Sequence, residues 1–273
     1  MSGCPRCTCH KNNVINRSLS GTGSGGGNRF RLAAYLDLAP RGMVATRKRP
    51  HVWKSAFSEA KGKMRILELF SGTGSIGKTF ADHGWEVISL DSDPKTDATI
   101  HADILTWDHT VYPPEHFDVI WASPCCTQYS CARRNAKTPR NLSLADSLVL
   151  RSREIIDYYN PRVWFIENPQ TGMLKDREFM QGIPFTDLDY CCYCNWGYKK
   201  RTRLWNNIGF QGDRCPGKGL CPNMAGRRHR ATAQQGKNKT KEGTYGNTFT
   251  VHKLHRVPSS LCSTIEQVCR PTE

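Results

Sequence analysis

The sequence predicts an α/β fold in which helices cover a doubly wound, mostly parallel sheet. Short apolar runs, typical of buried strands, alternate with amphipathic stretches, typical of helices, between Met64 and Ile166. The first of these strands leads through a glycine-rich turn into a helix, as the first strand of a βαβ unit does. With 273 residues, 38% of them hydrophobic, the chain is long enough to bury one such core.

The first βαβ unit is the clearest part of the pattern. Met64–Phe70 is a short apolar strand, and the turn Ser71-Gly72-Thr73-Gly74-Ser75 leads into an amphipathic helix that runs to His83. A second strand, Trp85–Leu90, ends at Asp91, and Asp103 follows the third strand. These elements place polar side chains at one edge of the predicted sheet.

The second half of the sheet follows the same alternation. Phe117–Ala122 and Val163–Ile166 are predicted strands, and Leu142–Tyr159 between them is a predicted long helix. Pro258 and Ser259 stand at the start of a terminal helix with Leu261, Ile265 and Val268 on one face.

Composition divides the chain into four segments. We expect a basic, largely flexible arm over residues 1–60 and the α/β domain over residues 61–205. A small basic, cysteine-rich insert follows over residues 206–250, and residues 251–273 carry the terminal helix that docks back on the domain.

The formal net charge of +15 is unevenly distributed. Two basic segments, from the N-terminus to Lys63 and from Arg214 to Arg256, contain very few carboxylates. This asymmetry favours a polyanionic partner, nucleic acid above all, with salt-sensitive binding. The alternative is that the surplus Lys and Arg only keep the protein soluble.

Cysteine usage and hydropathy indicate the compartment. Thirteen cysteines is an odd number, and no apolar stretch follows Met1, so we do not expect a secreted disulfide scaffold. No stretch approaches the roughly 20 apolar residues of a membrane span. We therefore expect a soluble, intracellular protein, in the nucleus or the cytoplasm, with no membrane partner.

The glycine turn predicts a nucleoside site. Backbone N–H groups at the start of a helix can meet a ligand, and Asp91, about 20 residues further on, can accept hydrogen bonds from ribose hydroxyls. Asp103 is placed to read an adenine amino group. No lysine follows the glycines as in a phosphate-binding loop, so a nucleoside without a triphosphate fits better. A glycine-rich turn without a ligand is the alternative.

Four motifs in fixed order carry a resemblance to a known family. They are Phe70-Ser71-Gly72-Thr73-Gly74, then Pro124-Cys125-Cys126-Thr127-Gln128-Tyr129-Ser130, then Glu167-Asn168-Pro169, and last Lys199-Lys200-Arg201-Thr202-Arg203. Together they cover about residues 64 to 205, and the chain there resembles a cytosine-5 DNA methyltransferase. The stretch from Val257 to Ile265 is similar to the family's last conserved element.

The resemblance implies a fold, a cofactor and a substrate. The fold is the Rossmann-like sheet of S-adenosylmethionine-dependent methyltransferases, with a short basic recognition insert. The residues implied at the S-adenosylmethionine site are Phe70, Gly72, Gly74, Asp91, Asp103 and Pro124. The substrate is a cytosine that must be flipped out of double-stranded DNA, because the reacting atoms are unreachable in the stack.

The resemblance also implies the catalytic residues. The register places the nucleophile at Cys126, whose thiolate adds to C6 of the base, and Cys125 at the position of the family's second proline. Glu167 shares a proton with N3, and Arg203 and Arg201 bind the base carbonyl or a nearby phosphate. Lys199 in place of glutamine and Pro169 in place of valine depart from the family pattern, as does Cys125, which under oxidation can form a vicinal disulfide. Taken singly, these residues also have purely structural interpretations. A buried cysteine can fill space in an apolar core, and a glutamate at a strand end can be a cap.

Cysteines in the insert suggest a metal. Cys215, Cys221 and His229 are ligand types that zinc uses, and Cys191 or Cys194 can complete a tetrahedral set, with Cys194 as our choice. Reduced thiols without a metal are the alternative. The basic residues Arg227, Arg228 and Arg230 and the stretch Lys237–Lys241 are expected to grip phosphates.

Two rival functions remain open at this point. An enzyme of similar mechanism can act on RNA, since a basic arm and a flipped cytosine do not exclude a 2′-hydroxyl. A catalytically inactive DNA-binding protein on the same fold is the second rival, and Cys125 in place of proline keeps it open. We expect a monomer in either case.

Overall fold

The computed structural model describes residues 62–271 apart from 234–235, 241–242 and 248. The arm expected over residues 1–60 lies outside the described residues. The part of the chain before the insert forms β1 (Arg65–Leu69), α1 (Ser75–Asp82), β2 (Glu86–Asp91), β3 (Ile100–His101), η2 (His109–Val111), β4 (Val119–Ala122), η3 (Cys131–Asn135), α2 (Leu142–Tyr159), β5 (Val163–Pro169), η4 (Met173–Asp176), η5 (Glu178–Met180), β6 (Phe185–Asp189), η6 (Tyr190–Cys192) and β7 (Arg201–Asn206).

The insert and the following segment contain short elements. Two antiparallel hairpins pair β8 (Met224–Ala225) with β9 (Arg228–His229), and β10 (Gly236–Thr240) with β11 (Gly243–Asn247). Two helices follow, α3 (Val251–His255) and α4 (Ser259–Cys269). No helix among the described residues has the length and apolar character needed to cross a bilayer.

One seven-stranded sheet organises these elements, in the order β3-β2-β1-β4-β5-β7-β6. The strands from β3 to β5 pair in parallel, whereas β7 runs antiparallel to both of its neighbours, β5 and β6. The strand order reverses between β1 and β4, which is the point where open α/β sheets bind their ligands at the carboxyl ends of the strands. The mixed α/β fold with a mostly parallel sheet confirms the fold class predicted from the sequence.

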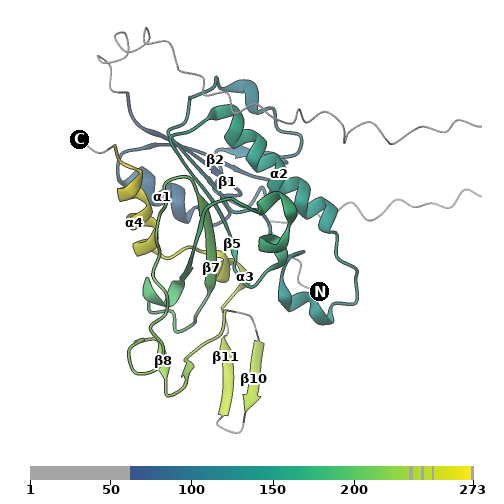
Figure 1. Cartoon of the computed structure of the whole chain (residues 1–273), viewed down its shortest axis with the longest axis vertical. Helices are drawn as coiled ribbons and strands as arrows, with labels where there is room; N and C mark the ends of the chain where they lie inside the picture. The colour runs from purple at the N-terminus through teal and green to yellow at the C-terminus, as the bar shows by residue number, and fades with distance from the viewer. Residues whose placement is uncertain (1–61, 234–235, 241–242, 248, 272–273) are drawn as a thin grey trace, which may run out of the picture. The chain divides into compact units, whose positions relative to one another are not determined.

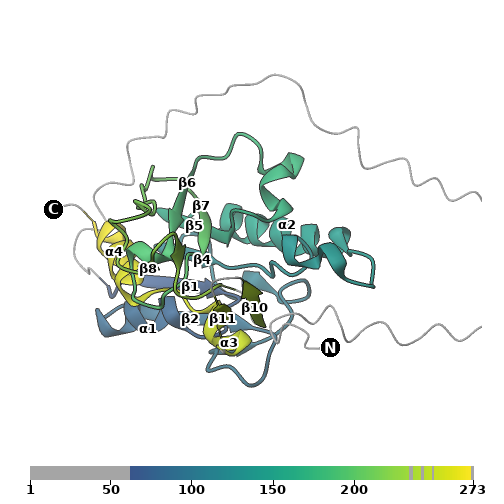
Figure 2. The same ribbon diagram turned by 90° about the horizontal axis from the view of Figure 1, so that it is seen from below.

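Helices cover both faces of this sheet (Figures 1 and 2). On one face α2 packs Val149, Ile155 and Tyr159 against strand residues such as Leu67 and Ile120. The other face is covered by α1 and α4, whose buried residues include Ile76, Phe80, Leu261 and Ile265. Adjacent residues of β1 and β4 therefore point into different layers, as the period of a strand requires.

A buried polar contact fixes α4 against the first βαβ unit. Glu266 is fully buried, and its carboxylate accepts hydrogen bonds from Trp85 Nε1 at 2.8 Å and from Arg270 Nε at 2.9 Å. Trp85 in turn packs edge-on against Phe80 of α1. The buried carboxylate is thus paired, as a buried charge must be to avoid a large desolvation cost.

Candidate active site

The glycine turn after β1 is held in a backbone conformation that few residues adopt. Gly72 and Gly74 have φ values of 49° and 64°, and the non-glycine residue Phe70 also has a positive φ of 59°. Such a residue in the left-handed region is uncommon, and strain of this kind is often found at functional sites. The turn delivers the chain from the carboxyl end of β1 into α1.

Two buried carboxylates support this turn. Asp91, only 2% exposed, accepts from the N–H of Gly72 at 2.8 Å and from that of Asp93 at 2.9 Å. Glu68 accepts from the N–H of Gly77 at 3.1 Å. A Cβ at Gly77 would lie 2.6 Å from Glu68 Oε2, so a larger residue there would displace this carboxylate. In this structure Asp91 therefore orients the turn, and its predicted bond to a ribose stays a prediction.

The residues predicted to hold the cofactor lie along one edge of the sheet. Phe70, Asp91, Asp103 and Pro124 each lie at or just beyond the carboxyl end of β1, β2, β3 or β4. A cavity of about 210 Å³ opens beside the turn and is lined by Gly72 and Gly74, together with Lys78, Ser89 and Thr99. This cavity does not include Phe70, Asp91, Asp103 or Pro124. We therefore do not assign the cofactor to it.

The cysteine loop follows β4 directly. Ser123 N–H donates to the carbonyl of Leu69 at 3.2 Å, and the carbonyl of Cys126 accepts from Tyr129 N–H at 3.1 Å. Cys126 is half-buried in this loop, and Cys125 beside it is buried.

Side chains from several elements fix the loop around this thiol. Asn168, at the end of β5, donates from Nδ2 to the carbonyl of Pro124 at 2.9 Å. The Arg140 guanidinium donates to the carbonyls of Gln128 and Ser130. Tyr129 is fully buried, and its hydroxyl donates to Asp146 at 2.7 Å. These bonds hold the loop in one conformation, which is what a positioned nucleophile requires.

Cys126 and Glu167 line the same pocket. Its volume is about 30 Å³, and its walls are Ser123, Pro124, Cys125, Cys126, Glu167, Pro169, Lys200 and His255. Glu167 lies near the end of β5 and is 8% exposed. The sequence order of the motifs therefore brings a thiol and a carboxyl together, from the ends of two adjacent parallel strands.

Two further side chains contact Glu167. Tyr190 is fully buried, and its hydroxyl donates to Glu167 Oε1 at 3.4 Å. Burial above all, and then the charge of Glu167, raises the pKa of Tyr190 well above its usual 10, so this hydroxyl keeps its proton. Lys200 Nζ lies 3.8 Å from the same carboxylate oxygen and 4.8 Å from the centre of the Tyr190 ring.

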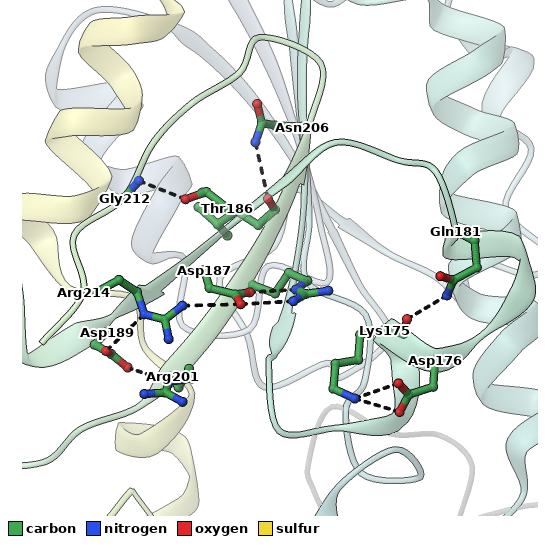
Figure 3. Close-up of polar contacts among 12 residues, drawn as sticks. Lys175, Asp176, Gln181, Thr186, Asp187, Asp189, Arg201, Asn206, Gly212 and Arg214 are labelled. Atoms are coloured by element: carbon green, nitrogen blue, oxygen red, sulfur yellow. Dashed lines mark hydrogen bonds and ion pairs between the residues drawn. The ribbon is translucent and has the colours of Figure 1, made fainter.

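The two predicted arginines lie elsewhere. Glu167 faces Leu204 across the β5–β7 pair, whereas Arg203 faces Asn168, so Arg203 projects from the opposite face of the sheet. Arg203 forms two hydrogen bonds with Asp187, at 2.7 and 3.0 Å, and Arg201 pairs with Asp189 at 3.3 Å. Figure 3 shows Asp187 and Asp189 within this ion-pair cluster, which Arg214 joins from the following loop.

Sequence reasoning missed the pocket residues Lys200 and His255, and also Tyr190, which contacts Glu167. The lysine belongs to the Lys199–Arg203 motif, but the motif does not say which alternate residues of the strand face Glu167. A shift of the strand register by one residue exchanges the two faces. Tyr190 comes from η6, an element whose position was not predicted.

A second cluster of chemically active side chains lies in the insert. Cys191, Cys215, Cys221 and His229 place one ligand atom each within 4.8 Å of one another. The predicted residues Cys215, Cys221 and His229 are therefore together, but the fourth member is Cys191 and not our choice, Cys194. The Cys194 thiol instead donates to the carbonyl of Tyr190 at 3.1 Å.

Comparison with known proteins gives this architecture a context. No family model matches the chain. The chain is 37% identical over 224 residues to a "Probable DNA (cytosine-5)-methyltransferase" of Frog virus 3 (isolate Goorha), an alignment that covers 76% of this chain and 100% of the relative. The fold and this likeness define an S-adenosylmethionine-dependent methyltransferase. More narrowly, the chain belongs to the DNA (cytosine-5)-methyltransferase family.

Solved structures give weaker likenesses. The Dnmt2 methyltransferase of S. pombe matches at 17% identity with a TM-score of 0.39, over 55% of this chain and 53% of that one. A Dnmt2 variant from Spodoptera frugiperda matches at 16% identity with a TM-score of 0.40, over 59% and 58% of the two chains. The aligned part of this chain thus spans little more than half the length of either structure.

Proposed function

We propose that this protein transfers a methyl group from S-adenosylmethionine to C5 of a flipped-out cytosine in DNA, through a covalent bond between Cys126 and C6. One observation carries the proposal above the others. Cys126, at the end of one strand, and the buried Glu167, at the end of the next, line a single pocket at the carboxyl edge of the sheet. The relative from Frog virus 3, whose name states a DNA substrate, supports the choice of nucleic acid.

The glycine turn fits a nucleoside cofactor. Gly74 is the N-cap of α1 and provides no side-chain cap, so the start of this helix is open to a ligand. Two glycines with positive φ keep side chains away from the turn. When bound, S-adenosylmethionine supplies an electrophilic methyl group. Phe70, Gly72, Gly74, Asp91, Asp103 and Pro124 are the residues that would hold it.

The thiol and the carboxyl have complementary tasks in this reaction. The thiolate of Cys126 forms a bond to C6, and the electron pair displaced from the C5–C6 double bond moves into the ring. Glu167 donates a proton to N3, so that C5 becomes the nucleophilic carbon of an enamine. C5 then forms its bond to the methyl carbon while the bond from that carbon to the sulfonium sulfur of the donor breaks, and the electron pair of that bond stays on the sulfur.

The cycle closes by elimination. Once C5 carries the methyl group, a base removes the proton from C5, and the electron pair left behind re-forms the C5–C6 double bond. The bond between C6 and sulfur breaks, Cys126 leaves as a thiolate, and N3 returns its proton to Glu167. Proton transfer by a positioned carboxyl of this kind is worth about 10² to 10⁴ in rate.

Lys200 takes the part that the sequence suggested for the two arginines. Its ammonium lies on the Glu167 side of β7 and lines the pocket. We infer that it binds the O2 carbonyl of the flipped base, where negative charge accumulates after attack at C6. Tyr190 donates to the same carboxylate oxygen, Oε1, and helps to hold the Glu167 carboxyl in place.

The pocket must widen to admit a base. Its volume of about 30 Å³ is two to three times the roughly 10 to 15 Å³ that a cavity needs to hold one water molecule, and a pyrimidine ring is larger than two or three waters. His255 of α3 and Lys200, directly before β7, lie on its walls, and their displacement would enlarge it. We expect the flipped base to push these side chains outward on binding.

A methyl-transfer assay tests the proposal. Labelled S-adenosylmethionine is supplied with unmethylated duplex DNA or matched RNA, to the wild type, Cys126→Ser and Cys125→Pro. Label in DNA as 5-methylcytosine that disappears in Cys126→Ser and survives in Cys125→Pro supports the proposal. Label in RNA alone favours the RNA enzyme. DNA binding without any methyl transfer favours the inactive DNA-binding protein.

A further inference from the structure

We propose that Cys191, Cys215, Cys221 and His229 bind one structural zinc ion, which fixes the DNA-reading insert to the strand pair β6–β7. The four residues come from three separate parts of the chain. Cys191 lies in η6, Cys215 and Cys221 lie in the loop between β7 and β8, and His229 lies in β9. Their ligand atoms nonetheless converge within 4.8 Å of one another.

The distances fit a tetrahedral zinc site. Zinc binds sulfur at about 2.3 Å and imidazole nitrogen at about 2.0 to 2.1 Å, so a tetrahedral angle separates a sulfur from a nitrogen ligand by about 3.6 Å. His229 Nε2 lies 3.6 Å from Cys215 Sγ and 3.5 Å from Cys221 Sγ. These two separations therefore match the sulfur–nitrogen edges of a zinc tetrahedron.

The ligand types select the metal. Three sulfurs and one imidazole are soft or borderline ligands, which suit zinc and do not suit magnesium or calcium. All three cysteines are free, so no disulfide competes for them. Four protein ligands close the coordination shell, which is the arrangement of a structural and not a catalytic zinc.

Surrounding hydrogen bonds hold the ligand-bearing backbone in place. Asn223 is 1% exposed, and its Nδ2 donates to the carbonyl of Cys191 at 2.9 Å and to that of Cys194 at 2.7 Å. Its Oδ1 accepts from Gly197 N–H at 2.9 Å. Asp189 accepts from Cys215 N–H, also at 2.9 Å. Such outer contacts orient metal ligands and are part of most built metal sites.

The position of the site indicates its role. Cys191 is preceded in the chain by Asp189 and Tyr190. Tyr190 contacts Glu167 in the pocket, and Asp189 pairs with Arg201 of β7. At the other end, His229 is flanked by the exposed Arg228 and Arg230. A metal here ties the basic hairpin of the insert to the strands that form one wall of the pocket. Such a brace suits a small segment that has little apolar core of its own.

Metal analysis of the full-length protein tests the proposal directly. The wild type, grown with zinc and purified without chelators, is expected to contain one zinc per chain. Cys215→Ser and His229→Ala are expected to lose it. Cys194→Ser is the matched control, because this cysteine lies beside the cluster but outside it, and it should keep the metal. Wild-type protein without zinc, or equal loss from the control and Cys215→Ser, would overturn the proposal.

A second measurement does not depend on the variants folding. Cobalt(II) added to wild-type protein from which zinc has been removed should give the strong visible absorption of a tetrahedral, thiolate-bound ion. Zinc added afterwards should abolish this absorption. A chelator should also lower the melting temperature of the wild type but not that of metal-free protein. Weak, octahedral-type cobalt absorption would contradict a Cys₃His site.

Discussion

Lys200 is a cationic side chain on a wall of the pocket shared by Cys126 and Glu167. Its side chain is 15% exposed, and its ammonium lies 3.8 Å from the Glu167 carboxylate. In such a dry site a fixed positive charge acts strongly on charge that develops in the base. Arg203 projects from the opposite face of β7, where it is bound to Asp187 and stacked 3.5 Å from the centre of the Phe185 ring.

We therefore expect Lys200→Met and Arg203→Met to have different effects. Lys200→Met should lower kcat by about 10²-fold or more, because it removes one charged donor at the reacting base. Arg203→Met should leave kcat within a few-fold and lower the free energy of unfolding by about 1 to 3 kcal/mol, through loss of its hydrogen bonds. Single-turnover rates and urea unfolding of both variants measure the two effects. If Arg203→Met lowered kcat and Lys200→Met did not, the arginine and not the lysine would act on the base.

These two residues also show the limit of sequence reasoning at this scale. The order of motifs was enough to bring Cys126 and Glu167 into one pocket, because both follow strands that a parallel sheet places side by side. The face of β7 depends on its register with β5, which no local pattern specifies. The choice between Cys191 and Cys194 was equally open. The two cysteines are only three residues apart in a tight turn, and the sequence does not say which of the two thiols joins the cluster.

At the scale of elements, α4 is bound to the first βαβ unit by the Glu266–Trp85 contact. Glu266→Leu should lower the free energy of unfolding by about 3 to 5 kcal/mol, because it leaves polar partners unpaired. Trp85→Phe should cost less. In a double-mutant cycle followed by urea unfolding, the two changes should be coupled by at least about 0.5 kcal/mol. Strict additivity would mean that the contact contributes nothing.

A second element contact makes stability depend on pH. His109 of η2 is buried against α2, and its ring nitrogen lies 3.1 Å from the Arg151 guanidinium. Burial, and then the charge of Arg151, lowers the pKa of His109 below its usual 6.5, although Glu154 and Asp108 act in the opposite direction. The neutral ring is therefore the form that the folded protein prefers.

The sign of the effect follows from this direction. With a lowered folded pKa, the contribution to stability is complete above pH 6.5 and is lost as the pH falls through the folded pKa. The free energy of unfolding should therefore decrease between pH 7 and 5, and less steeply in His109→Asn. A remaining slope is expected, because burial also lowers the pKa of His116. An identical slope in wild type and variant would exclude His109 as a cause.

The elements themselves differed in how well they could be predicted. Leu142–Tyr159 was predicted with both ends as the structure has them, since a long amphipathic period is a strong signal. Strand β6 was missed, because Phe185-Thr186-Asp187-Leu188-Asp189 carries two aspartates. These two charges are tolerated in a strand because they pair with arginines from β7 and its following loop: Arg203, Arg201 and Arg214. The pairing depends on the tertiary structure and cannot be seen in the local sequence.

For the whole molecule, the uneven charge should govern its affinity for DNA. The formal net charge is +15, and Arg227 and Arg230 are exposed on the insert. Each phosphate contact contributes about −0.9 to the slope of log affinity against log salt. Arg227→Gln and Arg230→Gln should each reduce this slope by up to about 0.9. Arg162→Gln, at the amino end of β5 and outside both basic segments, is the control and should leave the slope unchanged. Fluorescence anisotropy across a salt series measures it.

The docking of α4 on α1 also has a consequence for synthesis on the ribosome. Glu266 follows Trp85 by 181 residues in the chain. At about 5 to 20 residues per second, roughly 10 to 40 seconds pass between the translation of these two residues. During that time the nascent chain presents the apolar side of α1, including Ile76 and Phe80, without its cover. Translation stalled before α4 emerges should therefore leave a chain that chaperones bind and that aggregates once released.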